Sequence, residues 1–509
     1  MAVKINFNAE AAKTHTALVQ NERVMGKSLL RLSTGYRILN AADDSAGLFI
    51  ADMLGTVAAA LEQGNANIQT GISALQIAES SAGQIYTKLQ EIYVRAQRAA
   101  NDINDPNARA ALQQEINNFI DAIQKIGTDT EYNGIKLLDG TFTGKYIHYG
   151  ARADQVVSVS ISNLKASNIG AYVVQGTGKV TSSTTAYTSL ITGNWKYGDS
   201  GDKVTVAGVN LTSSTYLSYT GAVDAKAIAD AINNNATLQQ AGISARATNI
   251  STASTEWSNI QSTTGSVTMR FYVGSSTDTA KAIVITVNQG ETLTLDQLVS
   301  QINTQASAKG LNITASSSGN KLILQTTGET IGVEVIRSAT DAASVDLGML
   351  LQSATASASG NSQTASAVKV GNLTITGTDS YNYDFTGISA TNEGLGVAAT
   401  GSGSFQNLNS INVTTNSGAE LAMDIANTAI KKVDKVRAQI GAVMNNLQSI
   451  FDSQKVAYDN TKEAESVIRN TDYAKEMAEF VTYQIRMQAT VAMLAQANTL
   501  PQLVLQLMR

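Results

Sequence analysis

The segment Met25-Gly-Lys-Ser-Leu-Leu-Arg-Leu-Ser-Thr-Gly-Tyr-Arg-Ile-Leu39 decides the architecture at the start of the chain. Apolar residues recur in it at spacings of 4, 3, 4 and 3, at Met25, Leu29, Leu32, Tyr36 and Leu39. This spacing predicts a helix with a coiled-coil type of apolar seam. Further helices are expected over residues 45–100 and from Pro106, a residue suited to a first helical turn, to a stop at Gly127.

The end of the chain repeats this pattern. One apolar stripe runs from Ile430 to Ile450, and a second contains Met477, Phe480, Gln484, Met487, Val491 and Leu494, with Gln484 as its polar member. Pro501 is expected to end or kink the last helix, because proline disfavours helical backbone in the residue before it.

The middle of the chain differs in composition from both ends. Ser, Thr, Gly and Asn dominate, and alternating segments such as Ala282-Ile-Val-Ile-Thr-Val287 predict short strands. One pattern occurs twice: a strand, a helix ending in Ile-Asn at Asn233 or Asn303, and a second strand. The repetition predicts two small strand-helix-strand units.

Composition excludes several classes of function. The net charge is -5 without a basic cluster, which argues against nucleic-acid binding. There is no cysteine, so disulfides, thiolate metal sites and cysteine nucleophiles are excluded. The first ten residues lack the apolar core of a secretory signal, and no apolar run approaches the ~20 residues of a membrane span. We therefore expect no membrane insertion, and any export must use a route without a cleaved leader.

The terminal helices should need partners in order to persist. A helix of residues 1–35 offers apolar side chains worth roughly 15–30 kcal/mol if fully buried. Ordering those residues costs roughly 50 kcal/mol. Backbone hydrogen bonds offset part of the difference between these two free energies, but the apolar seam must still be covered for the helix to persist. The C-terminal helix can cover one side, and other copies of the chain would cover the rest.

Several blocks together resemble bacterial flagellins. At the start these are Arg31-Leu-Ser-Thr-Gly35, Arg37-Ile38 and Ala41-Ala-Asp-Asp-Ser-Ala-Gly47, followed by the blocks 71–79 and 131–138. The C-terminal blocks are Ile468-Arg-Asn-Thr-Asp-Tyr-Ala474 and residues 489–505. They cover most of residues 1–175 and 420–509 in order, and one departure is Leu39, where the family usually has Asn.

The resemblance implies an α+β multidomain fold, in which paired N- and C-terminal segments form a long coiled-coil-like helical bundle and a β-rich middle is inserted as outer domains. Residues 1–42 and 470–509 would form the inner terminal-helix domain, and residues 43–175 and 415–469 a helical bundle with a β-hairpin. Residues 176–414 would form the outer domains, with the repeats near 202–262 and 280–328.

The implied function is that of a secreted structural subunit, exported unfolded through the flagellar type III route and assembled into the extracellular filament for motility. Its partners would be copies of itself, an export chaperone on residues 491–507, and the filament cap and hook–filament junction proteins, with no cofactor, metal or catalytic residue. The terminal seams would form the subunit interface, with the residues Leu18, Met25, Leu29, Leu32, Met477, Phe480, Met487, Val491, Leu494, Leu503 and Leu505.

Two short segments carry more specific expectations. In the spacer motif Arg37, Asp43, Asp44 and Gly47, one aspartate should cap the helix that begins near Ser45, and Gly47 should permit a tight turn or close packing. In receptor-activating flagellins the segment after Leu89-Gln90 carries two arginines, a glutamate and a leucine, whereas Glu91, Tyr93, Val94 and Arg95 stand here. We expect weak or absent Toll-like receptor activation, which full potency in a cell-reporter assay would contradict.

Other functions remain as alternatives. A hook–filament junction protein shares the design of helical ends, and abundance in sheared appendages would separate it from a filament subunit. A zinc protease of the flagellin type needs two histidines four residues apart, but only His15 and His148 occur. Adhesion through the Ser/Thr-rich middle stays open, and binding assays would test it. Glycosylation also stays open, at sequons such as Asn210-Leu-Thr212 and Asn312-Ile-Thr314, and the intact mass would test it.

Overall fold

The computed structural model describes residues 7–101, 103–213, 215–338, 343–359 and 363–507, with side chains up to residue 499. It divides into two compact units. The first contains Met1–Ile77, Phe142–Ser160 and Ile440–Arg509, and the second contains Ala78–Thr141 and Ile161–Gln439. The helices are α1 (Ala9–Thr34), α2 (Ser45–Ala99), α3 (Pro106–Asp129), α4 (Tyr187–Leu190), α5 (Ala225–Asn233), α6 (Ala236–Gln240), α7 (Leu295–Lys309), α8 (Asn416–Arg469) and α9 (Tyr473–Leu507).

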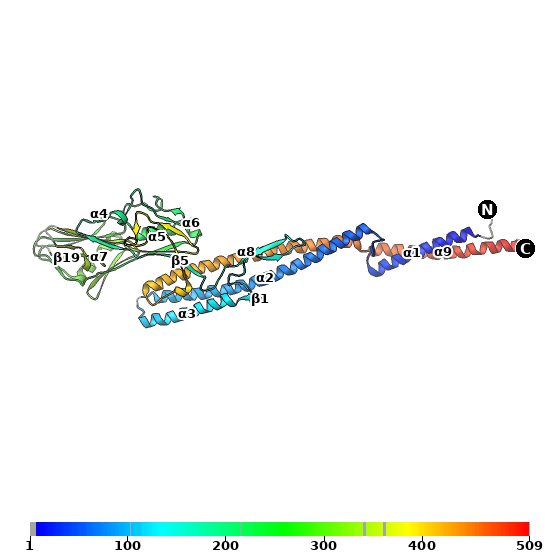
Figure 1. Ribbon diagram of the computed structural model, residues 1–509, viewed down its shortest axis with the longest axis horizontal. Coiled ribbons are helices and arrows are strands. Elements are labelled where there is room, and N and C mark those ends of the chain that lie inside the picture. The colour runs from blue at the N-terminus through cyan, green and yellow to red at the C-terminus, as the bar shows by residue number, and fades with distance from the viewer. Residues whose placement is uncertain (1–6, 102, 214, 339–342, 360–362, 508–509) are drawn as a thin grey trace. The chain divides into compact units, whose positions relative to one another are not determined.

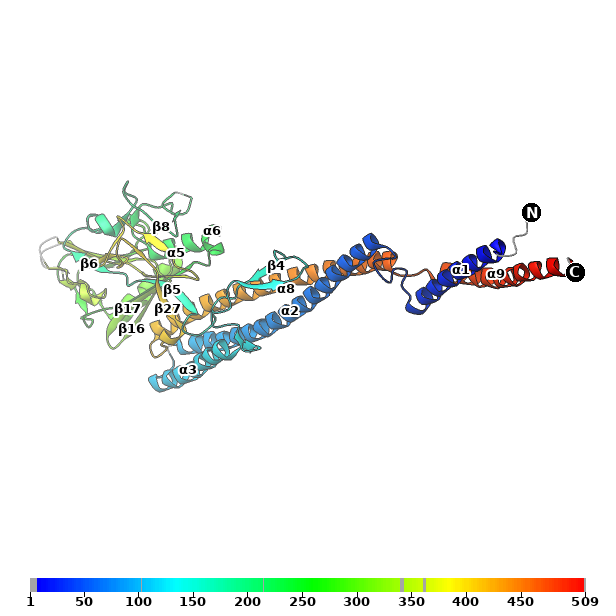
Figure 2. The same ribbon diagram turned by 45° about the vertical axis from the view of Figure 1, so that its right-hand side comes forward.

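In the first unit α1 lies beside α9, as both views show (Figures 1 and 2). The early part of α2 contacts the late part of α8, where Arg469 Nη1 lies 3.4 Å from Asp52 Oδ1. A hairpin of β3 (Lys145–His148) and β4 (Val156–Val159) lies against α2, and Asn67 Nδ2 donates to His148 O at 3.1 Å. Glycine makes this approach possible, because a Cβ on Gly64 would lie 2.0 Å from Tyr149 O.

In the second unit the rest of α2 packs with α3 and α8 (Figure 1). Arg437 Nη2 of α8 lies 2.8 Å from Glu79 Oε1 of α2. The fold class expected from the sequence is therefore confirmed: helices from both ends of the chain pair, and a β-rich middle is inserted between them.

Two predicted helix ends were wrong. Gly127 does not stop α3, which continues to Asp129. Gly127 is buried, and a Cβ there would lie 3.0 Å from Leu164 O, so this glycine serves close packing. The helix of the second repeat, predicted to end at Asn303, continues to Lys309. The last helix continues past Pro501 to Leu507, so Pro501 does not end it, and a kink there stays a prediction.

The β-rich middle is built from antiparallel sheets. The six-stranded sheet has the order β16 (Ile313–Ser318), β17 (Lys321–Thr326), β11 (Ser244–Thr252), β22 (Asn372–Gly377), β5 (Gly170–Gly176) and β27 (Ser404–Asn407). The five-stranded sheet has the order β14 (Ile283–Val287), β13 (Val267–Val273), β18 (Ile331–Arg337), β21 (Thr364–Lys369) and β6 (Val180–Ser183). The four-stranded sheet has the order β26 (Thr400–Ser402), β23 (Asn382–Asp384), β8 (Thr205–Val206) and β9 (Val209–Asn210).

Short pairs and 3-10 turns complete the described elements. The pairs are β1 (Glu131–Tyr132) with β2 (Ile135–Lys136), β7 (Lys196–Tyr197) with β10 (Gly221–Ala222), β12 (Ile260–Gln261) with β15 (Thr292–Leu293), β19 (Val345–Asp346) with β20 (Ser357–Ala358), and β24 (Ser389–Ala390) with β25 (Glu393–Gly394). The 3-10 turns are η1 (Gly193–Trp195), η2 (Leu347–Met349) and η3 (Leu408–Ser410).

Each strand-helix-strand repeat contributes its helix to a separate core. In the first repeat Ile228 and Ile232 of α5 pack in one apolar cluster with Ile375. In the second, Leu298 and Ile302 of α7 pack in another with Phe271. The copies are not isolated, because β17 of the second pairs with β11 of the first.

Candidate functional site

The paired terminal helices meet at a seam that combines polar and small residues with half-buried apolar ones. Asn8 Nδ2 donates to Ala497 O at 2.9 Å, and Asn21 Nδ2 donates to Thr490 Oγ1 at 3.0 Å. The buried residues at this seam are Ser28 of α1, with Glu476 and Ala497 of α9. These contacts join α1 and α9, but they do not cover all the large apolar residues of the two helices.

One ion pair lies inside this seam. Arg31 Nη1 is 3.6 Å from Glu476 Oε2, and only 8% of the Glu476 side chain is exposed. Arg31 Nε and Glu476 Oε1 are buried and have no hydrogen-bond partner among the described residues. Because an unpaired buried polar atom is unfavourable, the helix pair on its own is incompletely satisfied.

Other large apolar side chains lie on the outer surface of the helix pair. Eight of them are between 42% and 65% exposed: Val19, Leu29, Leu30, Met477, Val481, Ile485, Val491 and Met493. Several large apolar side chains exposed on one pair of helices are typical of an interaction surface.

The predicted seam residues divide between the two surfaces. Leu29, Met477 and Val491 belong to the exposed set. The half-buried residues are Leu18, Met25, Leu32, Phe480, Met487 and Leu494, whereas Gln484 is exposed. The side chains of Leu503 and Leu505 lie outside the described residues.

The exposed apolar surface extends to the start of α2. Phe49 and Met53 are 67% and 54% exposed, and Val467 of α8 is 74% exposed.

By length and composition α2 is also the one described helix that could cross a membrane: an 18-residue window has a mean hydropathy of 1.4, and 17% of it is buried. The start of α2 is accompanied by α8, which carries the charged residues Lys462, Glu465 and Arg469 there. These charges would have to enter the lipid together with α2, and placing charged side chains in lipid is unfavourable.

Two spacers connect these helices and pair with one another. Arg37 N donates to Arg469 O at 2.7 Å, and Thr471 N donates to Gly35 O at 2.8 Å. Arg37 Nη2 donates to Ile468 O at 2.6 Å, so its side chain ties one spacer to the end of α8. Sequence spacing alone gave no sign that the two spacers would meet.

The two aspartates of the first spacer have different roles. Asp44 Oδ1 accepts from Gly47 N at 2.8 Å, so Asp44 caps α2. Asp43 Oδ1 instead lies 2.6 Å from Lys27 Nζ. The Lys27 ammonium, with the Leu39 backbone N–H, holds the pKa of Asp43 below its usual range. A Cβ on Gly47 would lie 2.4 Å from Asp44 Oδ2 and 2.8 Å from Ile38 Cδ1.

The segment expected to alter receptor recognition lies on α2. Val94 is 51% exposed, while Arg95 pairs with Glu91 and with Glu115 Oε2 at 3.0 Å. The Arg95 guanidinium also lies over the Phe119 ring. These contacts hold Arg95 against α3.

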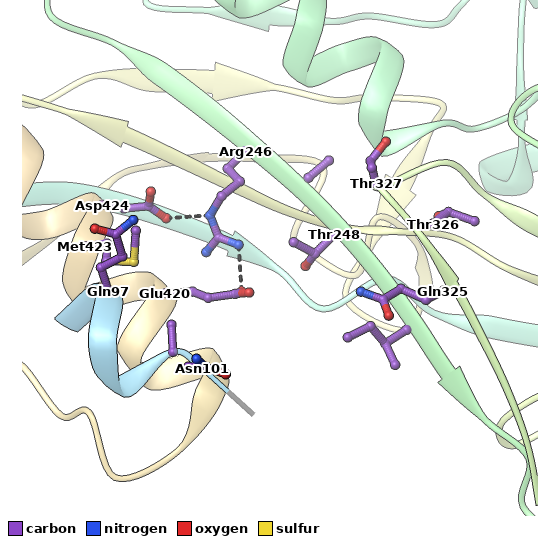
Figure 3. Close-up of a pocket in the computed structure, with 13 residues that line it drawn as sticks. Gln97, Asn101, Arg246, Thr248, Gln325, Thr326, Thr327, Glu420, Met423 and Asp424 are labelled. Carbon is purple, nitrogen blue, oxygen red and sulfur yellow. Dashed lines mark hydrogen bonds and ion pairs between the residues drawn. The ribbon is translucent and has the colours of Figure 1, made fainter. Parts of the chain in front are cut away.

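Sequence analysis missed a groove of about 490 Å³ in the second unit (Figure 3). It is lined by the end of α2, by β11 and β17, and by α8. Arg246 of β11 lies between two carboxylates of α8, with Nη1 2.7 Å from Glu420 Oε2 and Nε 2.9 Å from Asp424 Oδ2. No motif marks Arg246, because its partners are far away in the sequence.

Metal ions need a set of ligand side chains that lie close together. Among the described residues, no group of three His, Asp or Glu side chains could hold a metal ion. Of the two histidines, His148 contributes its backbone carbonyl to the hairpin contact on α2.

Comparison with known proteins identifies the family. The bacterial flagellin N-terminal helical region matches residues 5–143, and the C-terminal helical region matches residues 423–508. The flagellin of Aquifex pyrophilus is 52% identical, and that of Aquifex aeolicus is 51% identical; both alignments cover 100% of each chain. A solved structure, FliC from Burkholderia pseudomallei, superposes weakly, with a TM-score of 0.29, 16% identity, and coverage of 74% of this chain and 99% of that one. The chain belongs to the bacterial flagellin family and is a structural subunit of the flagellar filament, not an enzyme.

Proposed function

We propose that this chain is exported unfolded and then polymerises by burying the outer faces of its paired terminal helices against neighbouring copies. The observation that carries the proposal is the set of eight apolar side chains on α1 and α9 that are 42% to 65% exposed. Family membership supports a filament subunit, and these residues identify the surface that would hold the filament together.

The size of the exposed surface suits assembly. Fully burying one large apolar side chain contributes roughly 1.5–3 kcal/mol. Eight half-exposed side chains would therefore contribute on the order of 10 kcal/mol when covered, which is comparable to the entropy lost on association. A subunit would then add stably only where it contacts several neighbours at once, as it does at the end of a growing filament.

The remaining roles follow from this assignment. The inner layer would consist of residues 1–42 and 470–509, the next of 43–175 and 415–469, and the outer layer of 176–414. Val491 and Met493 lie in the segment assigned to the export chaperone and are exposed on α9. The chaperone would therefore cover part of the assembly surface until export. The filament cap and the hook–filament junction proteins would contact the same helical ends, outside the cell.

Electron microscopy of the purified protein tests the proposal. Full-length protein should form long tubes under salting-out conditions, and a version lacking residues 1–35 and 475–509 should stay monomeric. If the truncated version still polymerises, the terminal-helix mechanism is wrong.

Point variants sharpen this experiment. Ile485→Gln with Met493→Gln should raise the critical concentration for polymerisation at least about tenfold and leave the circular dichroism spectrum of the monomer unchanged. Tyr216→Gln is the matched control, because Tyr216 is 39% exposed but lies outside the terminal helices. Equal effects of the control and the double variant would contradict the assignment of this surface.

A further inference from the structure

We propose that α7 closes the edges of two sheets in the β-rich middle and so prevents strand addition between neighbouring copies. The inference rests on the proposed function, because a filament would hold many copies of these sheets side by side. It concerns the strands β14 and β16, which stand at the ends of the five-stranded and six-stranded sheets. An end strand presents unpaired backbone groups to which another chain can add.

The outward backbone groups of Val284, in β14, are already paired with a side-chain amide. Val284 N donates to Gln305 Oε1 at 3.0 Å, and Gln305 Nε2 donates to Val284 O at 2.7 Å. A side-chain amide offers one donor and one acceptor next to each other, as a backbone peptide does. Gln305 therefore occupies the place of a neighbouring strand. Lys309, one turn further along α7, donates to Ala280 O and Ala282 O beside this edge.

The same arrangement closes β16. Asn303 Nδ2 donates to Ala315 O at 2.9 Å, and Ala315 N donates to Asn303 Oδ1 at 2.7 Å. One helix thus covers the ends of two sheets with two amides that stand two residues apart.

The first repeat uses the same contact. Asn233 Nδ2 donates to Ala245 O at 2.7 Å, and Ala245 N donates to Asn233 Oδ1 at 2.9 Å. Ala245 lies where β11 pairs with β22 but not with β17, because the β17 register begins at Asn249. The Asn of the repeated Ile-Asn pair, at the end of α5 and within α7, therefore covers a strand residue that lacks a neighbour on that side. This contact gives the repeated Ile-Asn pattern a physical role.

The strand covered by Gln305 is the one that most needs cover. Residues 282–287 read Ala-Ile-Val-Ile-Thr-Val, without charge or proline. Short segments of high β-propensity and low charge are those that stack between chains when an edge exposes them. Val284 is also 36% exposed, so little other than α7 separates this edge from solvent.

Gln305→Met is the first test variant, since it keeps the length of the side chain and removes both hydrogen bonds. Gln301→Met is the matched control: Gln301 lies one turn earlier on α7 and is exposed. Hydrogen exchange on the full-length monomer should show exchange at the Val284 amide at least about tenfold faster in Gln305→Met and unchanged in Gln301→Met.

The second readout is association. Light scattering and thioflavin fluorescence of the monomer under mild heating should rise several-fold faster in Gln305→Met than in the control. Adding Thr286→Lys should reverse the effect, because a lysine on an edge strand opposes pairing. Filaments of Gln305→Met should bundle laterally in electron micrographs, while those of the control stay separate.

Two results would overturn the proposal. Unchanged exchange at Val284 would mean that Gln305 does not cover the edge in solution. Faster exchange without faster association would mean that Gln305 only stabilises α7 locally. Neither readout on the monomer needs polymerisation, so failure of the proposed function, seen as wild-type protein that forms no tubes, is distinguishable from failure of this inference.

Discussion

The paired terminal helices and the β-rich middle place their large apolar residues in opposite ways. On α1 and α9 the buried seam contains Ser28 and Glu476, while residues such as Ile485 are 60% exposed. In the middle Phe271, Ile285 and Val333 are completely buried or nearly so. The middle thus buries its large apolar residues within one chain, whereas the terminal helices leave several of theirs exposed, on the surface that we propose other copies cover. One polypeptide can combine a buried core with exposed apolar helices because the two regions are separate in sequence and in composition.

The largest expected effect comes from exchanging one large residue for alanine in each region. Phe271→Ala should lower the free energy of unfolding of the β-rich part by about 3–5 kcal/mol, because Phe271 is fully buried. Ile485→Ala should change monomer stability by less than about 0.5 kcal/mol and weaken polymerisation instead. Denaturant unfolding and the critical concentration measure the two effects. The comparison fails if Ile485→Ala destabilises the monomer as strongly as Phe271→Ala does.

A pH-dependent effect should appear in the middle of the chain. Burial, together with the charges of Glu329 and Asp230, raises the pKa of Asp224, at the start of α5, to about 7. Between pH 4 and pH 7 the folded state then binds a proton that the unfolded state has lost. Stability should therefore fall as pH rises through this window, by a few kcal/mol at most.

Asp224→Asn tests this expectation. Asn keeps the acceptor for Lys226 N and so keeps the helix cap, but it cannot ionise. Unfolding of the variant by denaturant should show a flatter dependence on pH between 4 and 7, with higher stability than the wild type at pH 8. An unchanged slope would assign the pH dependence to other groups. Burial also lowers the pKa of Lys369 to about 8. Above pH 8 this lysine makes stability rise with pH, which is opposite to the effect of Asp224, so the measurements should stop at pH 8.

A smaller effect is expected at the spacer, where the terminal helices meet the rest of the chain. Gly47→Ala should displace Asp44 or Ile38, which a Cβ would meet at 2.4 Å and 2.8 Å, and so weaken the cap of α2 by about 1–2 kcal/mol. Faster hydrogen exchange over the first turn of α2 is the measurement. Gly26→Ala is the control, because a Cβ there has nothing within 4 Å.

The smallest expected effect concerns Arg246 in the groove of the second unit. Arg246→Met should remove both contacts with Glu420 and Asp424 and keep the side-chain stem. Since Arg246 is about a third exposed, the loss should be about 1 kcal/mol or less. Limited proteolysis near the start of α8 should become faster, with unchanged polymerisation. A loss of polymerisation would show that the middle of the chain contributes to assembly.

Much of the local structure could be predicted from the sequence. The helix at residues 225–233 and the strand at residues 283–287 lie where the repeat pattern placed them, as α5 and β14. The apolar spacings predicted long helices at both ends, because a period near 3.5 depends only on neighbours along the chain. The aspartate pair was predicted to contain a helix cap, and Asp44 occupies that position.

Other features depended on contacts between distant residues. Gly127 was predicted to be a helix stop, but it lies inside α3 because the Leu164 backbone packs against it. The apolar spacing placed Leu29 and Gln484 on the seams, yet both are exposed. Their position depends on how α1 and α9 are rotated against each other, and Asn21, Ser28 and Thr490 at the seam fix that rotation.

The sequence by itself determined which segments are helices or strands, the lack of cysteine chemistry and the resemblance to a known family, since these follow from composition and short-range spacing. Tertiary structure decided which apolar residues of the terminal helices remain exposed, which aspartate caps α2, and that Asn233, Asn303 and Gln305 cover unpaired strand backbone. The physical reason is that burial and hydrogen-bond pairing are properties of a residue's neighbours in space. In this chain many of those neighbours lie tens to hundreds of positions away in the sequence.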